Sequence, residues 1–410
     1  MQSSPTRNLT AIKLLTFLMF TMFAMTTDSV GKIIDEVMKQ YKLTNVAAGA
    51  LHYGSMTAIA LAGIFLGFLA DRLGRKKTIV LGLVLFAVNS FLFVVGNDFW
   101  YFVGLLDVSG TAIGIFRTGA LALIGDISTS TSEHTRTMNT LEGFFGVGAI
   151  IGPAIVATLL AKGFAWKWLY VIAGGICSVL ILMALLVKYP ATVKSVDEPI
   201  NLQRTMRMMK NPYALGFSTG IFLYVAAECA VYVWMPSLLE GYKGPYPFMA
   251  VYALSIFFIL RAAGRFLGGW ALRLFSWTSL MVLFSLAIFA CFAGSVAGGL
   301  SYAIWLLPLS GLFMSMVYPT LNSKGISCFP KAEHGAVSGV ILFFTCTAAA
   351  LGPLAMGAVS DAFGHPKYGF VLATIFAGLL FTGLLLNRIY DPAKQRLAAL
   401  DTSEYRKALQ

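Results

Sequence analysis

Between Gly67 and Lys77 the chain reads GFLADRLGRKK, a short charged stretch with long apolar runs on both sides. Gly67 has no side chain and allows two helices to approach closely, and Asp71 stands at a helix end beside basic residues. The basic residues that follow would hold the stretch at a membrane surface. The pattern therefore predicts a tight loop between two membrane-spanning helices.

The composition of the whole chain predicts the same setting. Of 410 residues, 58% are hydrophobic and only 12% are charged, and the mean hydropathy is +0.78. Soluble domains carry roughly a quarter charged residues, so the sequence predicts an integral membrane protein. At about 20 apolar residues per crossing, the chain can hold about a dozen helices with little left outside the membrane. This excludes a soluble enzyme, a single-anchor receptor and a seven-helix receptor with long tails.

The charge pattern and the cysteines exclude other classes. The formal net charge of +12 is spread over short loops, and no polar basic run carries interleaved aromatic residues, so no nucleic-acid partner is expected. The five cysteines lie within or at the ends of apolar stretches and show no CxxC or His-Cys spacing. They are interpreted as small core residues, and we expect no disulfide, no metal site and no cofactor.

Twelve apolar segments predict an all-α membrane protein with twelve transmembrane helices. A polar stretch after the sixth segment divides the chain into an N-terminal six-helix bundle (1–190), a cytoplasmic linker (191–211), a C-terminal six-helix bundle (212–390) and a cytoplasmic tail (391–410). Most Lys and Arg fall on the side of the chain ends, which predicts cytoplasmic termini and a cell (inner) membrane location. The segments lie near 11–37, 46–71, 77–96, 99–126, 137–161, 166–188, 213–240, 247–273, 278–298, 300–325, 335–363 and 367–389.

Motifs recur between the two halves at a fixed offset of 200 residues. This registration predicts two parallel, duplicated halves. The histidines at 134 and 334 belong to one of the repeated motifs and are expected in solvated loops. The pairs are Asp28 and Glu228, Glu133-His134 and Glu333-His334, and Gly152-Pro153 and Gly352-Pro353.

The GFLADRLGRKK stretch resembles the cytoplasmic loop signature of the major facilitator superfamily. A degenerate copy that lacks the acidic residue recurs from Gly264 to Arg273. At a finer level the chain resembles the branch around the fucose permease and the sodium-dependent glucose transporters. Three stretches carry this likeness: YVAAECAVYVW (224–234), YPTLNS (318–323) and NTLE (139–142). The resemblance implies two pseudo-symmetric bundles that alternate access to a central cavity. It also implies an inner gate, made by Gly67, Asp71, Arg72, Gly74, Arg75 and Lys76.

Eight charged side chains fall inside the predicted helices, where each costs about 3 kcal/mol or more unless it has a partner or faces water. They are interpreted either as structural ion pairs between helices or as the lining of a solute cavity. Lys324 is expected to reach water at a helix end. The four acids are Asp28, Asp107, Glu142 and Glu228, and the four bases are Arg117, Arg261, Arg265 and Lys324.

The resemblance implies that helices 1, 4, 7 and 10 line the cavity, and small and polar residues share one face of helices 4 and 10. Asp28 and Glu228 occupy equivalent places in the two halves and are the predicted proton-coupling residues. The predicted solute-binding residues are Asp28, Arg117, Asn139, Glu142, Tyr224, Glu228, Tyr232, Arg261, Tyr318 and Asn322.

These features predict a monomeric secondary transporter in the lipid bilayer that moves a small polar organic solute, preferably a sugar or sugar derivative. A proton is the expected coupling ion, and sodium is the alternative. An organic-anion transporter is the alternative function, because Arg117 could bind a carboxylate unless Glu142 or Asp107 neutralises it. Pairing with Glu142 is favoured, since an unpaired buried arginine is costly.

Other activities are disfavoured by missing motifs. Helix 5 carries Ala154 to Ala157 where drug:proton antiporters have a Gly-Gly pair, which favours a symporter over an efflux antiporter. Neither a hydrolase or phospholipid-enzyme motif nor a repeated channel filter loop occurs, so we expect neither an enzyme nor a channel.

Overall fold

The computed structural model describes residues 5–42, 45–192 and 202–405, and within these ranges every regular element is a helix. Parts of the predicted linker (193–201) and of the predicted tail (406–410) lie outside the described residues. Ten helices in the described ranges are long and apolar enough to cross a membrane, so the chain is a multi-pass membrane protein. The segments predicted near 46–71 and 77–96 are also helical but are not among these ten.

The first half of the chain contains a break that the hydropathy pattern did not predict. The segment predicted near 11–37 forms one membrane span, Asn8–Ile34, but its helix is interrupted because the chain turns at Asp28 and Ser29. The Ser29 hydroxyl donates to the carbonyl of Met25 at 2.5 Å, a back-bond of the kind that bends helices. The elements are α1 (Pro5–Thr27), α2 (Val30–Tyr41), α3 (Asn45–Leu66), α4 (Leu69–Arg72), α5 (Arg75–Leu92), α6 (Phe99–Ile127), α7 (Thr131–Ala161) and α8 (Trp168–Leu186).

The second half contains two further irregularities. The segment predicted near 213–240 has a π-helical turn before Pro236, whose ring cannot accommodate a regular α-helical bond in the preceding turn. The segment predicted near 300–325 forms one membrane span, Leu300–Ser327, but its helix is interrupted, because α14 ends at Met314 and α15 begins at Val317. The elements are α9 (Leu202–Met208), α10 (Pro212–Cys229), η1 (Ala230–Trp234), α11 (Met235–Leu239), α12 (Pro247–Leu274), α13 (Trp277–Gly298), α14 (Leu300–Met314), α15 (Val317–Ser327), η2 (Lys331–Glu333), α16 (His334–Phe363), α17 (Lys367–Tyr390), α18 (Lys394–Leu400) and η3 (Asp401–Tyr405).

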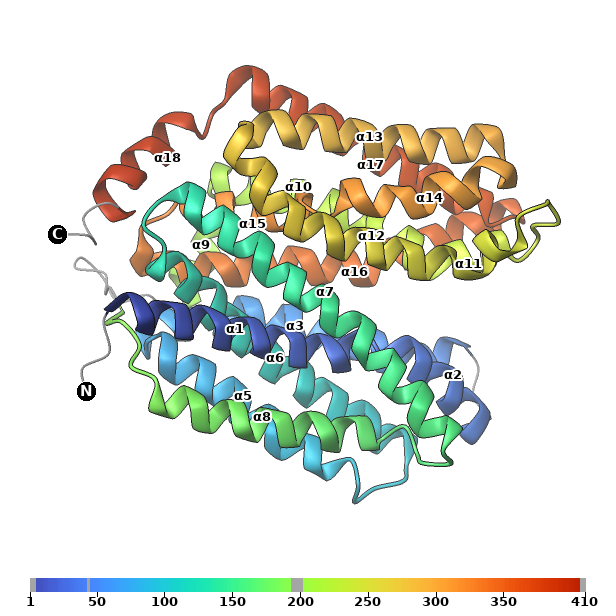
Figure 1. Ribbon diagram of the computed structural model, residues 1–410, viewed down its shortest axis with the longest axis horizontal. Coiled ribbons are helices and arrows are strands. Elements are labelled where there is room, and N and C mark those ends of the chain that lie inside the picture. Colours follow the sequence, from blue (N-terminus) through green and yellow to red (C-terminus); the bar gives the residue numbers. More distant parts are fainter. Residues whose placement is uncertain (1–4, 43–44, 193–201, 406–410) are drawn as a thin grey trace.

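Figure 1 shows the helices of the first half grouped on one side and those of the second half on the other, with both chain ends at the same end of the molecule. We call that end the terminal face and the other end the far face. Helix α3 packs against α16, and α7 packs against both α12 and α15. The two halves therefore meet along a seam built from these five helices.

Glycines of α3 and α16 approach one another very closely in the seam. A Cβ atom added at Gly339 would lie 2.0 Å from the carbonyl oxygen of Gly63 and 3.2 Å from the Cα atom of Gly67. No side chain fits in this space, so the two backbones touch directly. Membrane helices commonly associate through such small residues, because packing there cannot rely on the hydrophobic effect.

This crossing predicts a large difference between two otherwise similar substitutions. Gly339→Ala should lower the melting temperature of the purified protein by several degrees, because overpacking of this kind costs about 1–3 kcal/mol. Gly383→Ala is the matched control, since Gly383 lies inside α17 with nothing within 4 Å of an added Cβ atom. It should be neutral or stabilising. Equal melting temperatures for the two variants would contradict the close contact.

Candidate functional site

Six of the charged residues predicted inside the membrane gather where α1, α6, α7, α10 and α12 meet. One acid, Glu142 on α7, contacts two arginines from different halves of the chain. Its carboxylate lies 3.4 Å from Arg117 on α6 and 3.6 Å from Arg265 on α12, and its main-chain carbonyl accepts a hydrogen bond from Arg265 at 2.9 Å. The predicted pairing of Arg117 with Glu142 is therefore present. We call the six residues the central charge cluster: Asp28, Arg117, Glu142, Glu228, Arg261 and Arg265.

A second pair in the cluster lies wholly in the second half. Arg261 on α12 donates to Glu228 on α10 at 2.5 Å, and the Tyr224 hydroxyl lies 2.6 Å from the same carboxylate oxygen. The Tyr224 hydroxyl also lies 2.8 Å from the main-chain carbonyl of Met314, which the break between α14 and α15 leaves free. Glu228 is thus held by one base and one hydroxyl, and this arrangement connects α10, α12 and α14.

Asp28 differs from the two glutamates because no basic side chain in the described part of the chain forms an ion pair with it. It lies at the turn between α1 and α2, and among the described residues its Oδ2 atom is buried without a hydrogen-bond partner. The bases close enough to influence it electrostatically are Arg261, Arg265 and Arg117. Asp28 is therefore the acid of the cluster whose oxygen remains available to a proton or a solute hydroxyl.

Aromatic rings lie against two of the three arginines of the cluster. The guanidinium of Arg117 lies 5.1 Å from the ring centre of Phe145, and that of Arg261 lies 5.2 Å from the ring centre of Phe258. Cation–π contacts of this kind offset part of the cost of burying a cation. Both arginines are therefore held by an acid on one side and a ring on the other.

The other predicted solute-binding residues fall into two groups. Tyr232 on η1 is partly exposed, with its hydroxyl 2.7 Å from the Cys229 thiol, and Tyr318 is 6% exposed. Asn139 and Asn322 are fully buried: Asn139 donates to Thr320 across the seam at 3.3 Å. The structure therefore places Asn139 in the contact between the halves instead of in an open cavity.

Two intramembrane charges lie outside the cluster. Asp107 on α6 lines a groove with residues of α3, and its carboxylate lies against Gly54. The expectation that Lys324 reaches water is wrong, because the residue is only 4% exposed and its ammonium lies 3.4 Å from the carbonyl of Thr131 on α7. Lys324 therefore belongs to the contact between the halves.

The GFLADRLGRKK loop also reaches across the seam at the terminal face. The carboxylate of Asp71 accepts hydrogen bonds from the main-chain N–H groups of Gly335 and Ala336 at 2.9 and 2.8 Å, and it pairs with Arg75. These N–H groups belong to the first turn of α16, where the helix dipole favours an anion. The Asp71 side chain thus binds main-chain groups of the second half.

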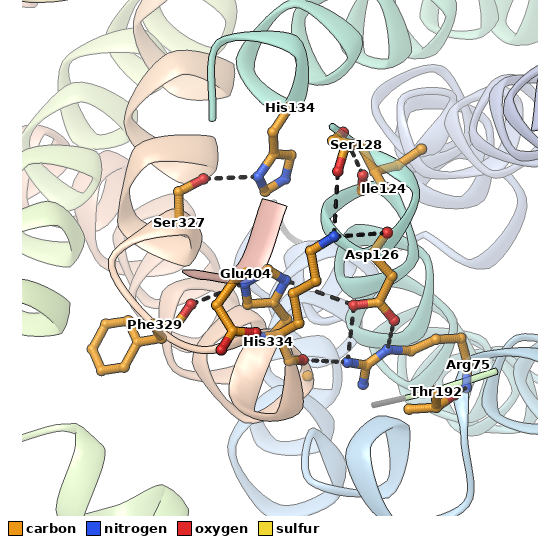
Figure 2. Close-up of polar contacts among 12 residues, drawn as sticks. Arg75, Ile124, Asp126, Ser128, His134, Thr192, Ser327, Phe329, His334 and Glu404 are labelled. Carbon is orange, nitrogen blue, oxygen red and sulfur yellow. Dashed lines mark hydrogen bonds and ion pairs between the residues drawn. The ribbon is translucent and has the colours of Figure 1, made fainter. Parts of the chain in front are cut away.

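Arg75 connects Asp71 to a wider set of polar residues, which we call the terminal-face network. Figure 2 shows its guanidinium beside Asp126, with Nε donating to the carboxylate at 2.7 Å. Arg75 also donates to the carbonyl of Lys331 at 2.6 Å, and the Lys331 ammonium donates to the carbonyl of Asp126 at 2.9 Å. The network is formed by Asp71, Arg75, Asp126, His134, Ser327, Lys331, His334 and Tyr405.

The two histidines of the repeat are part of this network. Both are fully buried, so the expectation that they lie in solvated loops is wrong. His134 Nδ1 lies 2.9 Å from the Ser327 hydroxyl, and His334 Nε2 lies 3.1 Å from the carbonyl of Phe329 (Figure 2). Because both residues sit at the first turn of seam helices, closure of the terminal face removes them from water.

Three other residues of the predicted gate act within the first half. Arg72 is exposed, and Lys76 donates to the carbonyls of Leu185 and Val187 at 2.9 and 3.0 Å. Gly74 has φ +93°, a conformation that L side chains rarely adopt, so a glycine is required there. These three residues shape the loop, whereas Gly67, Asp71 and Arg75 make contacts across the seam.

The chain is similar to several transporters of known sequence or structure. It is 24% identical over 383 residues to the "Glucose/galactose transporter" of Brucella abortus biovar 1 (strain 9-941), covering 90% of this chain and 92% of that protein. It is 24% identical over 405 residues to the "L-fucose-proton symporter" of Escherichia coli (strain K12), covering 88% and 89% of the two chains. The crystal structure of FucP in the outward conformation superimposes with a TM-score of 0.74 at 20% identity, covering 92% of this chain and 99% of that one.

The family comparison covers most of the sequence. The pattern described as "Major Facilitator Superfamily" matches residues 14–353, which include the GFLADRLGRKK loop, the central charge cluster and the terminal-face network as far as His334. The match agrees with the helical fold and with the transporters that resemble this chain. The chain belongs to the Major Facilitator Superfamily and is a membrane transporter, not an enzyme.

Proposed function

We propose that the protein is a proton-coupled symporter that takes up a small neutral sugar or sugar derivative by alternating access. The names of its relatives, a glucose/galactose transporter and an L-fucose-proton symporter, support a sugar as the solute and a proton as the coupling ion. The observation that carries the proposal is the charge balance of the central cluster. Arg117, Arg261 and Arg265 face three acids, and the acid left without a contacting base is Asp28.

The charge balance favours a neutral solute over a carboxylate. To bind an anion, a guanidinium needs a free edge for two parallel hydrogen bonds. Arg117 and Arg265 both contact Glu142, and Arg261 contacts Glu228. An incoming carboxylate would have to displace a buried glutamate from its partner and leave that charge unpaired, which costs several kcal/mol. An organic anion is therefore the second candidate, supported by the number of arginines and by the Nε atoms of Arg117 and Arg265, which are buried without a hydrogen-bond partner among the described residues.

The proposed architecture has twelve transmembrane helices in two pseudo-symmetric bundles, residues 1–190 and 212–390, joined by a cytoplasmic linker (191–211) and followed by a cytoplasmic tail (391–410). The 200-residue repeat and the position of both ends at one face support it. We assign the terminal face to the cytoplasm and the protein to the inner membrane, where it acts as a monomer in the lipid bilayer. Closure of that face then corresponds to an outward-facing or occluded state.

Asp28 is the proposed proton carrier. An acid that changes its protonation during transport must exchange its partners, and Glu142 and Glu228 already have basic ones. In the proposed site, three of the predicted solute-binding residues are partly exposed and can contact a solute: Asp28, Arg117 and Tyr232. The other predicted residues position these three residues or close the seam between the halves. They are Asn139, Glu142, Tyr224, Glu228, Arg261, Tyr318 and Asn322.

A ligand screen tests the solute class. The purified protein is melted with D-glucose, D-galactose, L-fucose, D-gluconate, D-galacturonate and benzoate, each at the same concentration. A neutral sugar should raise the melting temperature through preferential binding to the folded state, and the carboxylates should not. If only carboxylates raise it, the sugar proposal is wrong and the organic-anion function takes its place.

Substitution of Asp28 separates proton coupling from solute binding. In proteoliposomes, Asp28→Asn should abolish accumulation of the bound sugar under a pH gradient, because the amide cannot carry the proton. Exchange of labelled for unlabelled sugar should survive, since exchange needs no net proton movement. Asp107→Asn is the matched control, an acid on α6 that lines the groove beside α3, and it should accumulate sugar normally. Normal pH-driven accumulation by Asp28→Asn would remove Asp28 from the coupling mechanism.

The contact between Asp71 and α16 predicts a gating variant. Asp71→Asn removes the charge and one of the two acceptors for the N–H groups of Gly335 and Ala336, a loss of about 1.5 kcal/mol. The closed state should become roughly tenfold less favoured, so transport should slow while the sugar-induced melting shift persists. Asp361→Asn, an exposed acid at the other end of α16, should leave transport unchanged. Equal losses of transport and binding would instead indicate misfolding.

The sharing of Glu142 predicts a characteristic order of stability. Glu142→Gln leaves both Arg117 and Arg265 without an acid and should be the most destabilising variant, by about 3–5 kcal/mol. Arg117→Gln should cost less, because Glu142 keeps Arg265. The double variant Glu142→Gln with Arg117→Gln should melt at a higher temperature than Glu142→Gln alone. If the double variant melts lower, the two residues do not act as a pair.

A further inference from the structure

The C-terminal segment returns to the terminal face and contacts both halves of the transporter. After α17, the chain forms α18 and η3, which Figure 1 shows beyond the ends of the seam helices on the side of the two termini. We call residues 394–405 the C-terminal strap. Its contacts are distinct from those of the GFLADRLGRKK loop and of the central charge cluster.

The strap binds the first half at the start of α7. The carboxylate of Asp401 accepts a hydrogen bond from the main-chain N–H of Thr131 at 2.8 Å. That N–H is one of the donors that a helix leaves unpaired at its first turn, so the strap caps α7 from another part of the chain. The Tyr405 hydroxyl adds a second contact to α7, at 3.2 Å from His134 Nδ1.

The strap binds the second half through four further contacts. Arg396 donates to the carbonyl of Cys328 at 2.6 Å, and the Tyr405 hydroxyl lies 3.0 Å from the hydroxyl of Ser327. The N–H of Lys331 donates to Glu404 at 3.4 Å, and Figure 2 shows Glu404 beside the terminal-face network. The Lys331 ammonium lies 4.7 Å from the centre of the Tyr405 ring, in a cation–π contact.

Tyr405 is the residue that makes contact with both halves at once. Its side chain is fully buried although it stands near the end of the described chain, and its ring lies 6.3 Å from the rings of both His134 and His334. Burial raises the pKa of Tyr405 above its ordinary value, so the hydroxyl keeps its proton as a donor. The halves cannot separate at this face without removing Tyr405 from between them.

We propose that the C-terminal strap is a third part of the gate, which holds the terminal face closed and has to withdraw for that face to open. Tyr405 is its positioning residue: it bridges His134 of α7 and Ser327 of α15 and does not contact the solute. The inference rests on the alternating access proposed above. It adds to the gate a segment that the sequence alone predicts to be a cytoplasmic tail.

The test measures opening of the seam at a position away from the strap. In a background in which the five native cysteines are replaced by alanine, Ser323→Cys introduces a thiol on α15 at a fully buried site, where the native hydroxyl contacts Thr135 of α7 at 2.9 Å. The rate of its reaction with a water-soluble maleimide is measured in detergent, without sugar and at constant pH. This rate reports how often the two halves separate.

Tyr405→Phe should raise the labelling rate about three- to tenfold, the effect expected for losing hydrogen bonds to two buried partners. Tyr405→Ala and a chain ending at Ala393 should raise it further. Tyr390→Phe and Tyr390→Ala are the matched controls, because Tyr390 is 76% exposed at the end of α17, before the strap. They should label at the rate of the parent protein.

A second cysteine position distinguishes opening of the seam from unfolding. In a parallel background that keeps only Cys177, which is fully buried between α8 and α5, labelling should stay slow in every variant. Fast labelling of Cys177 would show that the rise at residue 323 reflects unfolding, and would overturn the proposal. An unchanged rate at residue 323 in Tyr405→Phe, Tyr405→Ala and the shortened chain would overturn it as well. Since no sugar or proton gradient is used, failure of the transport proposal leaves this readout intact.

Discussion

An ionised side chain inside a membrane has to be paired, and the central charge cluster follows from that constraint. Hydrocarbon offers no water to solvate a guanidinium or a carboxylate, so each charge depends on a neighbour from another helix. Glu142 meets this need for two arginines at once, one on α6 and one on α12. Because the partners come from opposite halves of the chain, the same contact that neutralises the charges also holds the halves together.

Pairing of buried charges also organises the terminal face, but with different groups. There the anion of Asp71 is stabilised by the first N–H groups of α16, and the cation of Arg75 is shared between Asp71 and Asp126. Asp401 caps α7 in a corresponding way. Both α7 and α16 carry a repeated Glu-His motif at their start on this face, and each start is capped by a carboxylate from elsewhere in the chain. Helix starts therefore serve as docking points for acids.

Local sequence patterns were sufficient for much of this structure. Long apolar runs predicted the helices, and the cost of a buried arginine predicted the Arg117–Glu142 pair. The inner gate that includes Asp71 and Arg75 was implied by the family resemblance of the GFLADRLGRKK stretch and stays a prediction. The breaks at Asp28 and after Met314 escaped prediction, because hydropathy averages over the few polar atoms that interrupt a helix. His134, His334, Lys331 and Tyr405 escaped because each looks like an ordinary polar residue of a loop or tail. Their burial arises only when the two halves and the strap close over them.

The distribution of the six cluster charges between the halves has an electrostatic consequence. The first half contributes Asp28, Arg117 and Glu142, which sum to one negative charge when all are ionised, and the second half contributes Glu228, Arg261 and Arg265, which sum to one positive charge. The two halves therefore attract each other across the low-dielectric core. A proton on Asp28 neutralises the net negative charge of the first half and weakens that attraction. Protonation would thus ease the separation of the two halves directly, through the long-range field, without any rearrangement of hydrogen bonds.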